Sequence, residues 1–449
     1  MIGEKEFGII RDRVFAASKA DDTEVSLGGG HENLTRFGEN RITQNVSEER
    51  YQLRVRVRKG RRQGLATTND FTPEGLERCV GEAEALAAIQ ADSDRVLDMA
   101  EGGERREDGA WDEATAAVSP TERAAWVEAA VETAAREGLE VGGIALTSEG
   151  TIADYGEIEP FAVANTRGLH RFAKKTRAIF EVSAQKDDGA GRSRALARQA
   201  GDIDPAKVAE DACRRALESR EPRQIETKPY TVVLEAEAVR ELLFFLHYLG
   251  FNGLAVAEKR SPLHDKLGQK VFGENITLRE DPAHPDLFGT TFDGEGVDTA
   301  SLSLVEGGVL ASFLHDRLSA RLTGQTPTGH GLSQPNGWGA FPRFPVLDGG
   351  EGGLDDLVGG LERGLLVTRL WYLNVVDPMQ MVVTGMTRDG TFLVEDGKVV
   401  GPVKNFRFNQ SLLDLFNQVE ALGEPVGLGD AVLPPLRVRD FRFTSGTDF

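Results

Sequence analysis

Hydrophobic and polar positions alternate with two different periods in the first half of the chain. Helical spacing of apolar residues predicts four amphipathic helices. Thr72, Ser119 and Asp204 each precede a proline that suits the first helical position, so they are expected to cap three of these helices. The predicted helices cover 4–19, 72–89, 119–134 and 202–219.

Extended patterns lie between these helices. In 51–60, three apolar residues alternate with Arg54, Arg56 and Arg58, which predicts a strand whose arginine face meets water. Further strand-like runs are found at 23–29, 142–148, 160–168 and 176–185. The first half therefore alternates helices with strands.

Two stretches of the first half resemble each other. GRSRALARQAGDIDP, which precedes the helix at 202–219, is similar to GRRQGLATTNDFTP, which precedes the helix at 72–89. We interpret this as an internal duplication in which residues 1–92 and residues 119–222 are the two copies. The alternative is two uses of one common helix-start signal, since proline at the first helical position is ordinary.

Strand signals and glycine dominate the second half, which follows a proline-rich linker at 219–230. Two hairpins are predicted at 298–316 and 391–408, because Gly307-Gly308 and Asp396-Gly397 separate apolar runs. Further strands are expected at 365–373 and 379–386, and helices at 235–249, 354–362 and 410–421. The predicted fold class is α+β, with an N-terminal helix–strand domain (1–222) and a β-rich, mostly antiparallel, barrel-like C-terminal domain (223–449).

Charge and cysteine content narrow the possible functions. The 449 residues include 52 Lys+Arg and 72 Asp+Glu, so the formal net charge is −20. This excess of acid argues against binding to nucleic acid or to an anionic membrane surface. Only Cys79 and Cys213 are present, and no apolar run is long enough for a signal peptide core or a transmembrane helix. We expect a cytoplasmic protein.

The histidines do not form a recognisable metal motif. No pair has HExxH, HxH or HxxxH spacing, and neither cysteine has a partner at CxxC spacing. A metal could still assemble from distant residues, although scattered polar residues are the favoured interpretation. The distant candidates are His264, Asp265, Asp281, His284, His315 and Asp316. His247 lies at the edge of an apolar helical stripe, which favours a packed or hydrogen-bonded histidine over a ligand.

Other catalytic signatures are absent from the sequence. It contains no GxSxG elbow and no GxxxxGK[ST] loop. Segment 324–350 is rich in Gly and Pro and carries Trp338, Phe341 and Phe344. Such a segment is equally consistent with a lid or partner-contacting element and with a simple connector.

The second half resembles the TldD/PmbA family, described as metalloproteases and also as modulators of DNA gyrase. The resemblance rests mainly on the stretch 364–423, which begins GLLVTRLWYLNVVDP, and on 231–239, 267–282, 292–299 and 436–444. The first half is similar mainly in layout. The resemblance implies that TldD-type members bind a metal through a helix with the motif His-Glu-x-x-x-His and through a cysteine near the C-terminus.

This chain departs from that motif. The positions that match its two histidines and its glutamate are occupied by Phe244, Leu249 and Phe245, and no cysteine follows Cys213. His247 is out of register. Since phenylalanine and leucine offer no lone pair to a metal, no metal-activated water is expected here. The resemblance is thus to the PmbA (TldE) branch.

This resemblance implies a non-catalytic subunit that forms a heterodimer with a TldD-type protease and takes part in peptide processing. Zinc is expected only in that partner, and this chain is expected to hold no cofactor. A peptide substrate would bind extended along a sheet edge. Two alternatives remain open: a stand-alone metallopeptidase with a relocated site near His264, His284 and His315, with His247 as a further weak candidate, and a homodimeric regulatory or scaffold protein.

Overall fold

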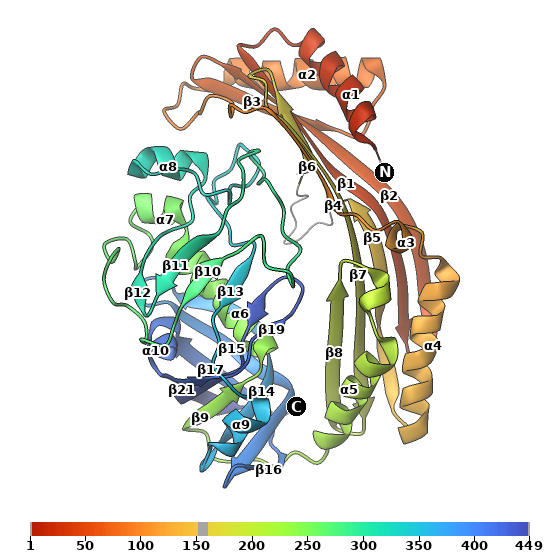
Figure 1. Cartoon of the computed structure of the whole chain (residues 1–449), viewed down its shortest axis with the longest axis vertical. Helices are drawn as coiled ribbons and strands as arrows, with labels where there is room; N and C mark the ends of the chain where they lie inside the picture. Colours follow the sequence, from red (N-terminus) through yellow and green to blue (C-terminus); the bar gives the residue numbers. More distant parts are fainter. Residues whose placement is uncertain (1, 151–159, 448–449) are drawn as a thin grey trace.

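The structure, a computed structural model, describes residues 2–150 and 160–447. Its first half forms one long curved sheet with helices on its outer side, and the second half faces the inner side of this sheet (Figure 1). The fold is α+β, as the sequence predicts.

A single sheet organises the first half. Its main path runs β3-β2-β1-β5-β7-β4, while β6 pairs with β1 and β7, and β8 pairs with β7. All pairings are antiparallel except that of β4 with β7. The strands are β1 (Asp22–Gly38), β2 (Arg41–Lys59), β3 (Arg62–Thr68), β4 (Glu104–Ala110), β5 (Glu140–Gly150), β6 (Pro160–Asn165), β7 (His170–Lys186) and β8 (Gly189–Ala197). The helices are α1 (Glu4–Ala17), α2 (Pro73–Ile89), α3 (Glu113–Ala116), α4 (Pro120–Glu137) and α5 (Pro205–Glu218), with a 3-10 turn η1 (Ala200–Asp202).

The predicted helix starts are confirmed. The side chains of Thr72, Ser119 and Asp204 accept hydrogen bonds from backbone N–H groups three residues later, in α2, α4 and α5. Each of these bonds satisfies a donor that has no partner within the helix. Local sequence is sufficient to fix these boundaries.

Two units with a similar order of elements share the sheet: α1-β1-β2-β3-α2, and α4-β5-β6-β7-β8-η1-α5, which has the additional strand β6 and turn η1. Each has its own apolar core against its helices. The long strands β1 and β7 contribute to both cores, for example through Leu27 and Phe37 of β1. The duplication and the domain boundaries at 1–222 and 223–449 stay predictions.

The expectation of a water-facing arginine row on β2 is wrong. Arg56 is 3% exposed, and its Nε lies 3.0 Å from Oε1 of Glu24, while Arg58 pairs with Asp22. The row faces the inner side of the curved sheet, where residues far away in the sequence cover it. Period-2 alternation predicted the strand correctly, but it cannot show what later segment covers the polar face.

The second half contains a closed barrel and a smaller sheet. Strands β14, β9, β21, β17 and β15 follow one another, and β15 pairs back with β14, which confirms the predicted barrel-like architecture. β16 pairs with β15, and β18 with β21. These seven strands are β9 (Pro229–Leu234), β14 (Arg363–Asp377), β15 (Val382–Glu395), β16 (Lys398–Pro402), β17 (Phe406–Ser411), β18 (Val419–Leu422) and β21 (Leu436–Gly446).

The smaller sheet runs β12-β11-β10-β13-β20-β19. It consists of β10 (Leu278–Glu280), β11 (Leu302–Glu306), β12 (Val309–Leu310), β13 (Pro345–Leu347), β19 (Val426–Gly427) and β20 (Val432–Leu433). The turns of both predicted hairpins are confirmed: Glu306 pairs with Val309, and Glu395 with Lys398.

The helices of the second half differ in part from the prediction. They are α6 (Ala236–Leu246), a π turn η2 (His247–Phe251), α7 (Gly253–Ala257), α8 (Arg317–Thr323), α9 (Leu354–Gly359) and α10 (Leu412–Asn417). The sequence did not predict α7 and α8. The helix expected at 410–421 ends early because residues 419–422 form β18, which pairs with β21. No helix in the described part of the chain is both long and apolar enough to cross a membrane.

Candidate functional site

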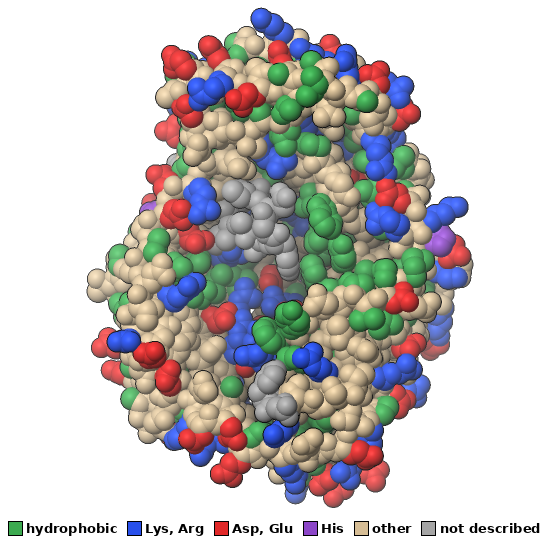
Figure 2. All heavy atoms as spheres, turned by 180° about the vertical axis from the view of Figure 1, so that it is seen from behind, with side chains coloured by type: hydrophobic (Ala, Val, Ile, Leu, Met, Phe, Trp, Pro, Cys, Tyr) green, Lys and Arg blue, Asp and Glu red, His purple; other side chains and the backbone are tan. Residues whose placement is uncertain are grey.

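A cleft of about 760 Å³ lies between the inner side of the long sheet and the second half of the chain. Seen from behind, basic side chains gather in the hollow between the two halves (Figure 2). We call its two sides the sheet wall and the loop wall. The sheet wall consists of Arg54, Lys175, Arg177, Arg194, Leu196 and Arg198, and the loop wall of Phe244, His247, Trp338, Phe341, Arg343 and Phe344.

The sheet wall follows from the pairing of β7 with β8. Ile179 lies opposite Leu196, and Glu181 opposite Arg194, so alternate residues of both strands share one face. That face carries Lys175 and Arg177 as well, whereas Phe180 and Val182 pack on the other side with α4 and α5. The alternation of β8, R-S-R-A-L-A-R, was available in the sequence, but the prediction did not include this strand.

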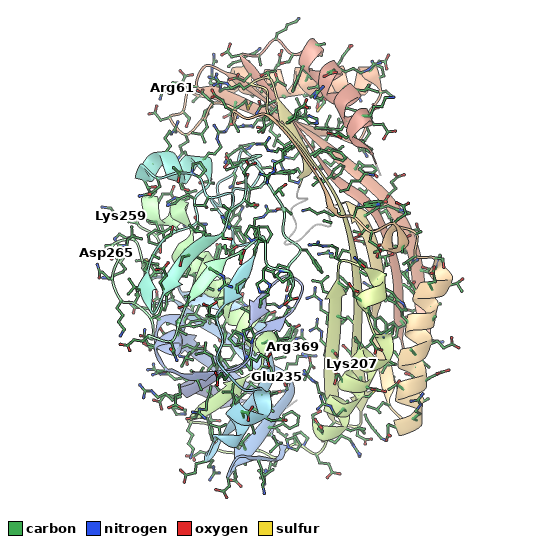
Figure 3. The ribbon with its side chains drawn as sticks, in the orientation of Figure 1. Arg61, Lys207, Glu235, Lys259, Asp265 and Arg369 are labelled. Atoms are coloured by element: carbon green, nitrogen blue, oxygen red, sulfur yellow. The ribbon has the colours of Figure 1, made fainter. Side chains whose placement is uncertain are left out.

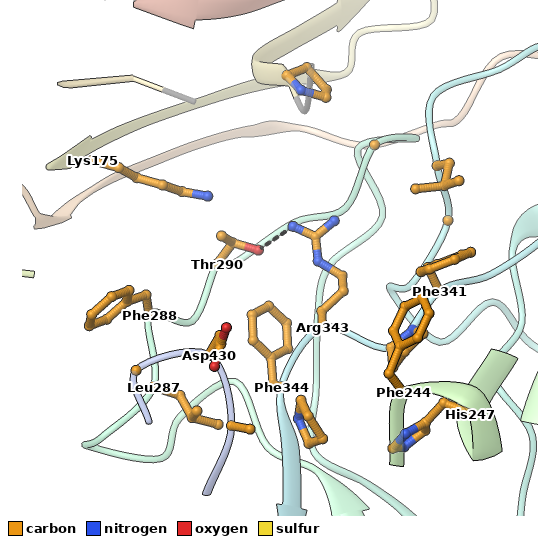
Figure 4. A pocket seen from close by; sticks show the side chains of 18 of the residues that line it. Lys175, Phe244, His247, Leu287, Phe288, Thr290, Phe341, Arg343, Phe344 and Asp430 are labelled. Carbon is orange, nitrogen blue, oxygen red and sulfur yellow. Dashed lines mark hydrogen bonds between the residues drawn. The ribbon is translucent and has the colours of Figure 1, made fainter. Parts of the chain in front are cut away.

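The loop wall is built mainly from aromatic side chains. Phe244 of α6 stacks nearly parallel to Tyr248 at 6.4 Å between ring centroids, and Phe341 lies 6.0 Å from both rings. Arg343 donates to the hydroxyl of Thr290 at 3.1 Å, as Figure 4 shows. Burial lowers the pKa of Arg343 to about 10. Its guanidinium therefore stays cationic at neutral pH.

A buried carboxylate, Glu280, fixes the loop wall from behind. Its Oε2 accepts the backbone N–H groups of Arg343 and Phe344 at 2.7 and 2.6 Å. Nε2 of His330 lies 3.3 Å from Oε2, and Nε2 of His247 lies 3.5 Å from Oε1. All three side chains are at most 1% exposed. This carboxylate connects β10, the π turn η2 that follows α6, and both ends of segment 330–344.

The pKa values of Glu280 and His247 depend on each other. Burial alone would raise the pKa of Glu280, but His330, His247 and the N–H of Phe344 together hold it below its usual value. Burial lowers the pKa of His247, despite the nearby carboxylate. Nδ1 of His247 also lies 3.0 Å from the carbonyl oxygen of Leu243. His247 is therefore buried and hydrogen-bonded, and its place among the weak metal candidates stays a prediction. The sequence did not single out Glu280 or His330.

Two further buried carboxyl groups, those of Asp293 and Glu295, accept backbone N–H groups near the loop wall. Asp293 accepts the N–H of Gly331 at 2.7 Å, and Glu295 accepts the N–H of Arg317 at 2.8 Å. Burial, with the nearby carboxylates of Asp293 and Asp316, raises the pKa of Glu295 to about 8. Burial also raises the pKa of Asp293 to about 6. Glu295 therefore holds a proton near neutral pH.

The three positions that match the family motif lie on or near the loop wall. Phe244 lines the cleft, while Leu249 belongs to the core of the second half and Phe245 packs against it. The π turn at 247–251 interrupts the predicted helix at this point. π turns inside helices are frequent at functional sites, but these three side chains present only carbon atoms.

The distant metal candidates lie in different surroundings. Nδ1 of His264 lies 2.9 Å from the carbonyl oxygen of Ser261, and the neighbouring Asp265 lies on the outer surface (Figure 3). His284 lies near Asp286 at 3.9 Å, and His315 is buried against Ser319 at 3.3 Å. Among the side chains that the structure describes, in residues 2–105, 110–150 and 160–447, no three His, Cys, Asp or Glu form a group that could hold a metal ion. The list of candidate ligands stays a prediction.

Comparisons with known proteins cover most of the chain. Family models of the PmbA/TldA metallopeptidases match in three parts: domain 1 over residues 23–87, the central domain over 113–220 and the C-terminal domain over 227–445. The chain is 26% identical to the metalloprotease PmbA of Escherichia coli O157:H7, over 94% of this chain and 93% of that protein. It is 24% identical to a metalloprotease TldD homolog of Buchnera aphidicola, over 49% of this chain and 46% of that protein.

A solved structure shares the whole architecture. The crystal structure of TldE from Thermococcus kodakarensis superimposes with a TM-score of 0.85, over 98% of this chain and 99% of that chain, at 21% sequence identity. At this identity, the likeness shows a common fold.

Proposed function

Because this chain belongs to the PmbA/TldD family, we propose that it is a non-catalytic, peptide-binding subunit that acts together with a metal-bearing TldD-type protease. One observation carries the proposal: the motif positions are Phe244, Phe245 and Leu249, and the position at the cleft, Phe244, offers a ring instead of a ligand. Since these residues do not fit zinc, no hydrolytic step is assigned to this chain. In this proposal, zinc and the catalytic base belong to the partner, and the complex processes peptides in the cytoplasm.

The edge of β8 supports peptide binding. β8 pairs with β7 on one side, and no other strand in the described part of the chain pairs with its second edge. Arg194 and Leu196 of this strand, and Arg198 directly after it, line the cleft. An extended peptide can add to such an edge through main-chain hydrogen bonds, which gives affinity without a strict sequence requirement.

An exposed apolar segment supports assembly with a partner. Five large apolar residues near the tip of the β14–β15 hairpin are exposed, and Tyr372 reaches 66%. Contiguous exposed apolar surface marks interaction sites in many proteins. The segment comprises Trp371, Tyr372, Val375, Val376 and Met379.

Metal content tests the non-catalytic assignment. We expect the purified full chain to contain zinc far below one equivalent and to retain none after dialysis against a weak chelator. The matched variant is His247→Gln, because His247 is the histidine that lines the cleft. Stoichiometric zinc in the natural chain, lost in this variant, would contradict the proposal and favour a stand-alone metallopeptidase.

Association tests the role of the exposed segment. The double variant Tyr372→Ser/Val376→Ser is expected to weaken binding to a TldD-type subunit in size-exclusion chromatography. Leu267→Ser, at another position that is 52% exposed, serves as the control. A stable homodimer that ignores the TldD-type subunit would instead favour the scaffold alternative.

A further inference from the structure

Trp338 differs from the other three tryptophans of the chain. Nε1 of Trp111 donates to a carboxylate at 2.9 Å, and the ring of Trp126 packs edge-on against a phenylalanine. The ring of Trp371 is covered by Arg388, whose guanidinium carbon lies 4.2 Å from the ring centroid. Trp338, by contrast, is 60% exposed, and no described residue stacks on its indole or accepts a hydrogen bond from its Nε1.

The backbone around Trp338 is fixed on both sides. Its carbonyl oxygen accepts from Nδ2 of Asn252 at 2.6 Å, and its N–H donates to Oδ1 of Asn336 at 2.7 Å. Asn252 is 4% exposed, and its Oδ1 caps α7 by accepting two backbone N–H groups of that helix. The loop that carries Trp338 is therefore tied to a regular element of the second half.

A glycine next to Trp338 allows this close approach. Gly339 has a φ of +84°, and a Cβ at this position would lie 2.5 Å from Oδ1 of Asn252. Any other residue would strain the backbone and push the asparagine away. The carbonyl oxygen of Gly339 also accepts from Nδ2 of Asn336 at 2.8 Å. Local structure thus holds the backbone of Trp338, while its side chain stays exposed.

The exposed indole lies on the loop wall of the cleft. Leu332 and Pro335 of the same segment line the cleft with it. The rings of Phe244 and Phe341 on this wall already contact each other, at 6.0 Å between centroids. Tryptophan offers two apolar faces and one N–H donor. On a fixed backbone such a side chain binds a ligand with little loss of conformational entropy.

An extended peptide would bring side chains to this indole. In the proposed function, a peptide pairs with the edge of β8, and its side chains point alternately to opposite sides. Every second side chain would then face the loop wall. There, a large apolar side chain can cover a face of the indole of Trp338, and Nε1 can donate to a carbonyl oxygen of the peptide.

We infer that Trp338 makes the cleft select extended peptides that carry a large apolar or aromatic side chain at the position facing its indole. The inference rests on the proposed peptide-binding function and names the substrate class. An exposed tryptophan is also typical of a surface that binds a partner subunit. The experiment separates these two uses.

Fluorescence anisotropy with the full chain tests the inference. The probes are labelled peptides of about ten residues, enough to pair along a whole strand, that alternate Ser with Thr and carry one central Phe, Leu or Ala. We expect the Phe peptide to bind about tenfold more tightly than the Ala peptide, because it buries more apolar surface and its ring stacks on the indole. The Leu peptide should lie between them. The three peptides have the same charge, so charges in the cleft do not affect the comparison.

Variants locate the effect. Trp338→Ala should remove most of the preference for Phe and leave the affinity for the Ala peptide unchanged. Trp338→Phe keeps an aromatic face and should retain part of the preference. Trp371→Ala is the matched control, because this tryptophan is 38% exposed on the β14–β15 hairpin, outside the described lining of the cleft, and it should change nothing.

Tryptophan emission shows whether the peptide reaches the indole. A peptide with a central p-nitrophenylalanine quenches a tryptophan that it approaches closely. We expect binding of this peptide to quench the natural chain strongly and to quench Trp338→Phe much less, although that variant still binds the peptide. Trp371→Phe should be quenched like the natural chain. A purely structural role of Trp338 would not produce this difference.

The outcomes separate the inference from the proposed function. Equal binding of the Phe and Ala peptides, or an unchanged preference in Trp338→Ala, would overturn the selection and leave peptide binding intact. No binding of any peptide would overturn both. Weaker association of Trp338→Ala with a TldD-type subunit, with unchanged peptide binding, would assign the indole to the subunit interface and overturn the inference.

Discussion

A buried carboxylate lies on the sheet side of the cleft and another behind its loop wall, but the two carboxylates have different partners. On the face that carries the sheet wall, Glu24 binds Arg56 at 3.0 Å, and the two strands involved are direct neighbours. Behind the loop wall, Glu280 lies between His330 and His247, which come from segments distant in the sequence. Arginine keeps its charge at every physiological pH, whereas histidine can lose it.

We therefore expect the charge of the sheet wall to be insensitive to pH and the position of the loop wall to respond to pH. The sheet wall has regular main-chain pairing and cations of fixed charge. The loop wall has little regular structure, and its position depends on N–H groups that Glu280 and Asp293 accept. We therefore expect pH to affect the aromatic side of the cleft more than its basic side.

The largest expected effect comes from removing the anchor of the loop wall. Glu280→Ala leaves two buried N–H groups and two buried histidines without their carboxylate. We expect a loss of about 3–5 kcal/mol in the free energy of unfolding. Urea denaturation measures it, with Glu274→Ala as the control, because Glu274 pairs with Lys270 on the exposed surface. A loss as small as that of the control would show that the loop wall does not depend on Glu280.

The matching change on the sheet side should behave differently with pH. Glu24→Ala leaves Arg56 buried, and we expect a loss of about 2–4 kcal/mol that is the same at pH 6 and pH 8, since the arginine cannot discharge. The loss caused by Glu280→Ala should be smaller at pH 8 than at pH 6, because Glu280 opposes the lowering of the His247 pKa by burial, and this matters only where the unfolded chain protonates that histidine. Urea denaturation of both variants at both pH values decides this. Parallel pH dependence of the two variants would remove the distinction between the walls.

A smaller, pH-dependent effect is expected at Glu295. Its raised pKa of about 8 means that the folded state keeps a proton that the unfolded state has released above about pH 4.5. The stability contributed by this group therefore falls as pH rises from about 4.5 to about 8. Glu295→Gln cannot titrate, so its stability relative to the natural chain should increase across this range. Thermal unfolding at pH 5 and pH 8 measures the change, with the exposed Glu306→Gln as the control. A constant difference would contradict the buried-proton assignment.

The sequence predicted what local periodicity and capping determine. Thr72, Ser119 and Asp204 mark helix starts without any tertiary information, and Asp396-Gly397 marks a hairpin turn. Long-range contacts decided the rest. The helix expected through 421 ends early because residues 419–422 pair with β21 as a strand, and Arg56 of β2 is buried because Glu24 and Met99 contact it.

The site could be predicted only in part for the same reason. The sequence singled out Phe244 through the family resemblance and His247 at the edge of an apolar helical stripe, and both line the cleft. Glu280 could not be singled out, because it lies in a strand of three residues and meets His330 through the fold alone. The cleft-facing residues Arg194, Leu196 and Arg198 were predictable in principle, because they alternate with small residues in the sequence of β8 and the residue after it.

Peptidase activity on reconstitution tests the central claim most directly. The full chain, a subunit that bears His-Glu-x-x-x-His, and an equimolar mixture of the two are assayed on the same unstructured peptide with zinc present. The account predicts no hydrolysis by this chain alone and an activity of the mixture well above that of the metal-bearing subunit alone. Zinc-dependent hydrolysis by this chain in the absence of any partner would contradict it.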